Sequence, residues 1–190
     1  MRIRLALLTL LLPAGLSGQT FIRASGGITA STSILKDIIR EPISARQSAA
    51  PTAALLVGWQ LPSGYRLGVE ARYAMGTLTV DDDGVTDDIG GLNTLNVALF
   101  ADGPIGHNLR WEAVAGMLRY QPEHEVGAFR DGAPSPWMRG GGVTWSRPIG
   151  ATVRLVVGAR YDFHAFTTKR LEADAYSAHQ AVHRIGLTAG

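Results

Sequence analysis

The sequence predicts an all-β fold, an eight-stranded antiparallel up-and-down barrel, from three observations. Arg23, Arg66, Arg110 and Arg154 recur at intervals of 43, 44 and 44 residues, and such a period is typical of one supersecondary unit repeated along a chain. Each arginine lies in a run that alternates polar and apolar residues, as a strand with two different faces does. Long polar segments and short turns separate these runs in alternation, which is the pattern of consecutive hairpins in a small closed barrel.

The N-terminal segment, residues 1–18, is expected to be a signal peptide that precedes a barrel of residues 19–190. Arg2 and Arg4 form a basic start, residues 5–12 form an apolar stretch, and Gly15-Leu16-Ser17 offers the small residues of a cleavage site. The alternative, an uncleaved membrane anchor, requires a longer apolar run.

Removal of this segment leaves a chain that is neutral overall. Residues 19–190 contain 16 basic and 16 acidic residues, so nothing in the charge indicates a nucleic-acid partner. The chain has no cysteine, which excludes a disulfide framework. No stretch after residue 18 has the roughly 18 apolar residues of a membrane helix. A place in a membrane would therefore require a closed barrel, whose strands satisfy every backbone group.

Eight strands are expected in order along this segment. They cover residues 20–31, 49–61, 65–79, 92–102, 108–120, 137–147, 151–166 and 180–190. The short turns, at 61–64, 102–106 and 147–150, each contain proline and glycine, which favour turn geometry. The long loops, at 32–48, 80–91, 121–136 and 167–179, then all lie at the same end of the barrel.

Alternation alone does not decide which face of the strands is inside. In the run 65–79 the odd positions include Leu67 and Val69, whereas the even positions include Arg66, Glu70 and Arg72. A soluble lipocalin-like periplasmic carrier would place the apolar face inside, around a ligand. A membrane barrel would place the charged face inside.

Three features favour the membrane barrel. Residues 19–190 contain only two lysines, Lys36 and Lys169, both in expected loops, although a water-facing wall normally carries lysine in its strands. The polar face is rich in small residues that leave room for arginines in a narrow lumen. Aromatic residues gather at the two ends of the apolar face, as at two bilayer interfaces. Those near the short turns are Trp59, Tyr65, Trp111 and Trp145, and those toward the long loops are Tyr73, Tyr161 and Phe163.

Two arginines, Arg119 and Arg139, fall on the apolar face by parity. Both lie near the long-loop end, where an arginine can reach lipid phosphates. Alternatively, a β-bulge at the glycines of residues 140–142 shifts the register.

With its signal segment, its alanine- and glycine-rich strands and the Arg-Tyr pairs at 72–73, 119–120 and 160–161, the chain resembles the small bacterial outer-membrane β-barrel family of the OmpA/OmpX type. The resemblance implies a transmembrane barrel in the outer membrane of a Gram-negative bacterium, with extracellular long loops. Its partners would be outer-membrane lipids, lipopolysaccharide and the barrel-insertion machinery. The chain ends at residues 187–190 without the C-terminal aromatic residue usual in that family.

The candidate site is a charged network in the lumen. By parity it contains Arg23, Arg66, Glu70, Arg72, Arg110, Glu112, Arg154, Arg160, Asp162 and Arg184. Enclosed charges require partners, so a plug of salt bridges is the first interpretation, with Glu70 near Arg66 and Glu112 near Arg110. Because seven positive charges face three negative ones, a narrow anion-favouring path is the second.

Other clusters give weaker signals, and we expect no metal, no cofactor and no catalytic residue. The acidic segment 81–88 suggests calcium but lacks the EF-hand pattern, and Glu123-His124-Glu125 offers adjacent ligands that point apart. The spacing of Ile34, Leu35, Ile38 and Ile39 predicts a short amphipathic helix in the first loop. His183 on the apolar face suggests a lipid-modifying enzyme, but no serine nucleophile accompanies it.

The sequence therefore predicts a cell-envelope barrel with a packed lumen, acting in structural support or surface binding through its loops. The alternatives are a porin-like, anion-favouring passage for small solutes and the soluble carrier. The sequence names no extracellular partner.

Overall fold

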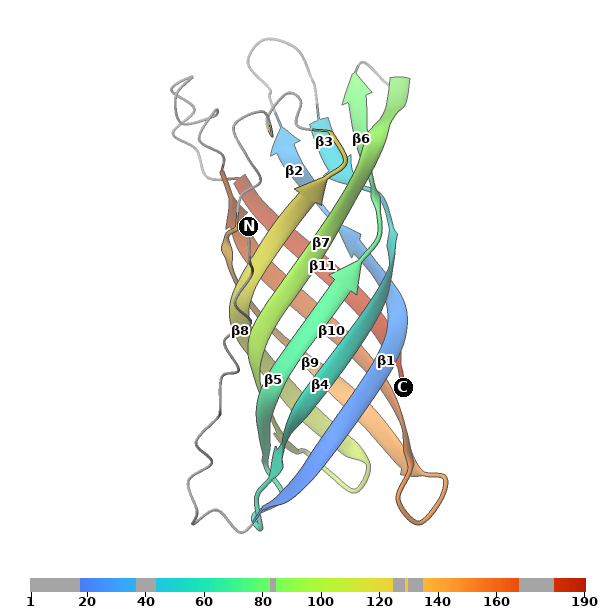
Figure 1. Cartoon of the computed structure of the whole chain (residues 1–190), viewed down its shortest axis with the longest axis vertical. Helices are drawn as coiled ribbons and strands as arrows, with labels where there is room; N and C mark the ends of the chain where they lie inside the picture. The colour runs from blue at the N-terminus through green and yellow to red at the C-terminus, as the bar shows by residue number, and fades with distance from the viewer. Residues whose placement is uncertain (1–17, 37–43, 83–84, 125–128, 130–134, 168–179) are drawn as a thin grey trace, which may run out of the picture.

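The computed structural model describes residues 18–36, 44–82, 85–124, 129, 135–167 and 180–190. The signal segment predicted for residues 1–18 lies, apart from Gly18, outside the described residues. Within the described residues the structure has eleven strands, and eight of them close an antiparallel barrel (Figure 1). The barrel strands are β1 (Gln19–Ser31), β4 (Ala50–Gln60), β5 (Arg66–Ala74), β7 (Val85–Pro104), β8 (Leu109–Pro122), β9 (Trp137–Pro148), β10 (Arg154–Phe166) and β11 (Gln180–Ala189).

The predicted all-β fold and its up-and-down barrel are confirmed. Going around the barrel, the order is β1-β4-β5-β7-β8-β9-β10-β11, and β11 pairs with β1 to close it. Each strand therefore pairs with its neighbours in the barrel, so the chain leaves no long unpaired edge around the wall. The strands tilt strongly against the long axis of the molecule (Figure 1), as closure of a small barrel requires.

The first short turn forms at the predicted residues, whereas the other two lie a few residues later than predicted, because β7 continues through Pro104 and β9 through Pro148. In the first, the amide of Leu61 donates to the carbonyl of Tyr65 at 2.8 Å, and Gly64 adopts a φ of 84°. That left-handed conformation favours glycine. The other two turns are closed by backbone bonds from Ile105 to Leu109 and from Ile149 to Val153.

Three short strands extend the wall beyond the barrel at the long-loop end: β2 (Ser33–Lys36), β3 (Ser44–Gln47) and β6 (Thr77–Asp82). β3 pairs with both β2 and β6, and β6 pairs with residues 85–91 of β7. We call β2, β3, β6 and residues 85–91 the strand extension. The prediction that 32–48 and 80–91 are loops was therefore wrong in part, and the predicted strand 65–79 divides into β5 and β6.

The predicted helical face in the first loop was also wrong for the residues that the structure describes. Ile34 and Leu35 lie in the extended strand β2, and Ile34 is buried against the lumen cluster. β-Branched residues pack well on a pleated surface, and here that packing decides the conformation. Ile38, Ile39 and Lys169 lie outside the described residues.

Side chains alternate between the lumen and the outside along each barrel strand. On β8, even-numbered residues from 112 to 120 are buried and odd-numbered residues from 111 to 119 are exposed. The lumen receives the charged side chains, among them Glu70, Asp102 and Arg160, with 1%, 0% and 4% of their surfaces exposed. The outside receives large apolar ones, such as Ile22 and Leu99, both 70% exposed. The predicted orientation of the two faces is confirmed.

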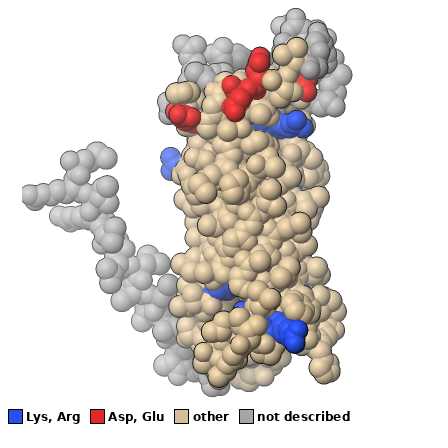
Figure 2. All heavy atoms as spheres, turned by 90° about the vertical axis from the view of Figure 1, so that its right-hand side faces the viewer, with Lys and Arg blue, Asp and Glu red and all other residues tan. Residues whose placement is uncertain are grey.

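The outward residues of the barrel strands form the outer wall. On the face shown in Figure 2, charged side chains gather toward the two ends and leave an uncharged band between them. The predicted aromatics lie on this wall: Tyr65, Trp111, Trp145 and Tyr161 are exposed, and Trp59, Tyr73 and Phe163 are partly exposed. Trp137, 74% exposed, belongs with them and was not predicted. No helix in the described part of the chain is long and apolar enough to cross a membrane, a finding with no bearing on crossing by strands.

The outward arginines are real features of the wall and do not result from a shifted register. β9 pairs with β10 without interruption from Pro148 to Met138, so the alternative of a bulge at residues 140–142 was wrong. Arg119 and Arg139 are both exposed. The guanidinium carbon of Arg139 lies over the ring of Phe163, 5.3 Å from its centroid.

Candidate functional site in the lumen

The lumen is filled by three groups of polar contacts beneath an apolar cap. Nearest the short turns, Asp102 receives two arginines from neighbouring strands. Arg66 forms a bidentate pair with it, with Nε 3.0 Å from Oδ1, and Arg110 donates from Nη2 to Oδ1 at 2.7 Å. Arg110 also donates to the carbonyl of Gly64 at 2.5 Å, and Arg66 lies over the ring of Phe21. Through the bond from Arg110 to Gly64, this group connects the first short turn to the charged residues of the lumen.

Glu70 is the centre of the middle group. Its carboxylate lies 2.6 Å from Nη1 of Arg160, 3.3 Å from Nε of Arg72 and 3.6 Å from Nη2 of Arg23. Arg23 continues to Glu112 at 3.5 Å. Arg160 also pairs with Asp162, its Nε 2.9 Å from Oδ1.

The middle group therefore contains three carboxylates and three arginines, all largely removed from water. Charges in such surroundings are strongly destabilising unless they are paired and hydrogen-bonded. The contacts join β1, β5, β8 and β10, so they cross the lumen as well as follow the wall.

The upper group centres on Arg184, whose Nη2 donates to Oε1 of Gln47 at 2.9 Å and to Oγ1 of Thr94 at 3.1 Å. Gln47 in turn donates to the carbonyl of Leu92 at 2.6 Å. In this group the partners of Arg184 are thus an uncharged amide and a hydroxyl, whereas the arginines of the other two groups pair with carboxylates.

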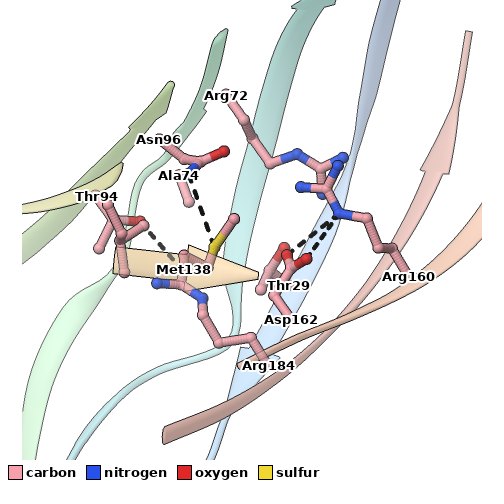
Figure 3. A pocket seen from close by; sticks show the side chains of 10 residues that line it. Thr29, Arg72, Ala74, Thr94, Asn96, Met138, Arg160, Asp162 and Arg184 are labelled. Atoms are coloured by element: carbon pink, nitrogen blue, oxygen red, sulfur yellow. Dashed lines mark hydrogen bonds and ion pairs between the residues drawn. The ribbon is translucent and has the colours of Figure 1, made fainter. Parts of the chain in front are cut away.

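A small cavity lies between the middle and upper groups (Figure 3). Arg72, Asn96, Met138, Arg160 and Arg184 are among its lining residues, and its volume is about 10 Å³, room for about one water molecule. Nη1 of Arg184 and Oδ1 of Asn96 lack a protein partner, so the polar lining suits a water molecule. This volume is far too small for a substrate or a bound metabolite.

An apolar cap closes the lumen toward the long-loop end. It consists of the buried residues Ile34, Leu92, Tyr120, Phe129, Phe166 and Val182. The rings of Tyr120 and Phe166 meet edge to face, 5.2 Å between centroids, and Phe129 contacts both rings. The Tyr120 hydroxyl bonds Nε2 of His164 at 2.8 Å, so the cap is joined to the polar groups below it.

Most of the predicted network lies together in the lumen, but its pairing differs from the prediction. Glu70 does not pair with Arg66, nor Glu112 with Arg110, because Asp102 takes both of those arginines. Arg154 is exposed at the short-turn end, where its Nη2 donates to Oγ of Ser146 at 3.2 Å. It does not join the charged groups.

Asp102 is the principal residue that sequence reasoning missed. It was assigned to a turn because Gly103 and Pro104 follow it, whereas β7 continues through Pro104. Its even parity with Asn96, Ala98 and Phe100, all buried, was the available signal. With Asp102 included, the lumen carries one more negative charge than was predicted.

The weaker candidates do not assemble into a site in the described residues. No group of three or more His, Asp or Glu side chains is placed there to hold a metal ion. Asp87 and Asp88 lie in the strand extension, and Glu123 accepts a bond from the amide of Gly91 at 2.9 Å. Asp83 and Glu125 lie outside the described residues. His183 lies on the outer wall, bonded through Nδ1 to the Tyr161 hydroxyl.

No family model matches this chain, and no curated protein matches it either.

Proposed function

We propose that this chain is an outer-membrane β-barrel of a Gram-negative cell envelope, exported by its N-terminal signal segment, with a packed lumen and a surface-binding or structural role. The observation that carries the proposal is the inverted polarity of the barrel. Buried ion pairs fill the inside, and exposed Ile22, Leu99 and Ile185 represent an outer wall rich in large apolar side chains.

Such a wall is unfavourable in water and favourable in lipid. Monomeric soluble proteins rarely expose contiguous apolar surface of more than a few hundred Å², and hydrocarbon removes that cost. The closed hydrogen bonding around the barrel also meets the requirement that lipid places on backbone groups. A soluble carrier with an apolar ligand inside would need the opposite arrangement of faces.

The filled lumen favours a scaffold over a passage. Three polar groups and the apolar cap occupy successive levels of it, and the cavity between them has room for about one water molecule. The strand extension and the loops at that end would then carry recognition of an extracellular partner. Outer-membrane lipids, lipopolysaccharide and the insertion machinery would be the partners of the wall.

The test is gel mobility of the full chain, extracted from membranes in mild detergent, with and without boiling. A membrane barrel is expected to resist unfolding without heat and to run faster before boiling than after it. A protein found in the soluble fraction, with a single band, would overturn the proposal.

A further inference from the structure

A groove in the outer wall near the long-loop end has features that neither the fold nor the lumen explains. It is lined by Arg139, Gly140, Gly141, Tyr161, Phe163 and His183, and its volume is about 520 Å³. We call it the wall groove. It lies on β9, β10 and β11, whose pairing places Arg139, Phe163 and His183 side by side in one row.

From these residues we propose that the wall groove binds a phosphate-bearing membrane lipid, with the headgroup at Arg139 and an acyl chain along Gly141. The inference rests on the proposed function, because it requires the wall to face lipid. The occupant is a lipid of the leaflet at the long-loop end.

Arg139 is held in place but keeps its charge available. Its guanidinium carbon lies 5.3 Å from the centroid of the Phe163 ring, and within the described residues it has no carboxylate partner. Stacking on one face leaves the N–H groups at the edge of the guanidinium free, and these match the oxygens of a phosphate in a bidentate arrangement. A cation in this position, otherwise surrounded by apolar wall, is best matched by an anionic lipid headgroup.

Tyr161 and His183 add a second polar contact beside this cation. The Tyr161 hydroxyl bonds Nδ1 of His183, and the His183 amide donates to Oγ1 of Thr32 at 3.0 Å. In the tautomer in which Nδ1 accepts from the Tyr161 hydroxyl, Nε2 carries the proton and is a donor for a headgroup oxygen.

The hollow itself comes from missing side chains. Gly141 faces outward and pairs with Ala113 on one side and Tyr161 on the other. A Cβ added at Gly141 would meet only the Glu112 carbonyl oxygen, at 3.5 Å, which is an ordinary contact. The space outside Gly141 is therefore open. Toward the short turns, Val143 and Leu187, both exposed, flank Ala159 on the neighbouring strands. A chain of methylene groups fits that apolar surface.

The experiment titrates the purified full chain, in nonionic detergent, with dioleoyl phosphatidic acid, and measures bound lipid by native mass spectrometry. Dioleoyl glycerol, which has the same chains and no phosphate, is the matched lipid, and inorganic phosphate is the free anion. We expect phosphatidic acid to bind about tenfold more tightly than dioleoyl glycerol. The Arg139→Gln variant should remove that difference.

Two further variants make the test specific. Gly141→Leu should fill the groove without a clash at its Cβ and should weaken binding of both lipids. Arg119→Gln removes another outward arginine, which does not line the groove. It should leave the binding of both lipids unchanged. An equal loss in Arg119→Gln and Arg139→Gln, or no preference for phosphatidic acid, would overturn the site. So would competition by inorganic phosphate at the same concentration as the lipid.

The outcome separates the two proposals. A chain that lacks a heat-dependent mobility shift and stays in the soluble fraction contradicts the membrane assignment. A chain that shows the shift but binds both lipids alike contradicts only the wall groove.

Discussion

At Asp102, a single carboxylate with no exposed surface serves two arginines, Arg66 and Arg110. Loss of its charge would leave both guanidinium groups beside a neutral amide in a poorly solvated lumen. We expect Asp102→Asn to lower the free energy of unfolding by about 2–3 kcal/mol, as measured by urea unfolding in detergent. Asp87→Asn, at an exposed position of the same strand, is the control and should have little effect. Equal effects of the two substitutions would contradict the role of Asp102.

The adjacent glycines 140 and 141 provide a second contrast between inside and outside. A Cβ at Gly140 would overlap Oδ1 of Asp162 and come within 2.8 Å of the Tyr161 carbonyl, whereas a Cβ at Gly141 meets one atom at 3.5 Å. We expect Gly140→Ala to destabilise the barrel by about 1–3 kcal/mol. Gly141→Ala should stay within about 0.5 kcal/mol of the parent. Comparison of the two unfolding midpoints tests this, and a larger effect at Gly141 would reverse the assignment of faces.

Residue parity predicted the network well where strands are regular and less well near their ends. Glu70, Arg72 and Arg160 were assigned correctly because long alternating runs fix which face each residue occupies. Asp102 and Arg154 lie where a strand meets a turn, and sequence signals for turn and strand compete there. The pairing partners were also not predictable, because Glu70 meets Arg160 across 90 positions of the chain, and residue spacing carries no information on such contacts.

At the scale of elements, the strand extension is separable from the barrel. Pairing of β7 with β8 begins at Leu92, and pairing of β7 with β5 begins at Thr94. The strand pairing of the described residues within 81–88 is to β3 and between β6 and β7. We expect a chain with residues 81–88 replaced by a short turn to keep the mobility shift of the closed barrel. Loss of that shift would mean that the tip is required for closure. The same variant tests whether the tip carries a surface partner.

The extension was missed because its strands are short and their partners distant. β2 and β3 have four residues each, too few for an alternating pattern to stand out. The acidic residues of 81–88 favour loops by composition. β6 and β7 nevertheless pair there, because the pairing of β5 with the barrel part of β7 already brings these two segments together. The pairing that continues from the β5–β7 hairpin therefore outweighs the loop preference of these acidic residues.

At the scale of the whole molecule, the outer wall is where polarity matters most. Leu99 lies midway along the barrel part of β7 and is 70% exposed, and Ile149 in a short turn is 66% exposed. If the wall lies in lipid, Leu99→Arg should destabilise the membrane form by about 2–4 kcal/mol and Ile149→Arg by about 0–1 kcal/mol. Refolding yield into lipid vesicles, followed by gel mobility, measures the difference. Similar yields for the two equally exposed sites would contradict a lipid-facing wall.

Conductance tests the alternative of a small-solute passage. With the charged groups and the apolar cap at successive levels, we expect the full chain to give no steady conductance in planar bilayers. Phe166→Ala thins the cap but leaves the Glu70 group in place, so it should remain closed as well. Anion-selective conductance by the unchanged chain would revive the passage suggested by the excess of arginine.

The fold as a whole was predictable because one unit repeats four times. The 43–44 residue period and the alternation mark all four repeats, and proline-glycine turns mark the three junctions between them. An error at one strand end therefore leaves the others unaffected. Closure itself follows from those repeats, since an open sheet would expose edge backbone groups. The strand extension is not part of this repeat, so the repeat could not predict it.

The ion pair between Glu70 and Arg160 joins strands on opposite sides of the barrel. β5 and β10 are separated by three strands in either direction around the sheet, so the bridge spans the lumen. In a partly assembled sheet without β10, Glu70 would lack Arg160, its closest partner. An unpaired charge is destabilising in a lumen that is largely removed from water. Assembly should therefore be cooperative, because the ion pair that Arg160 makes across the lumen becomes available only when β10 arrives.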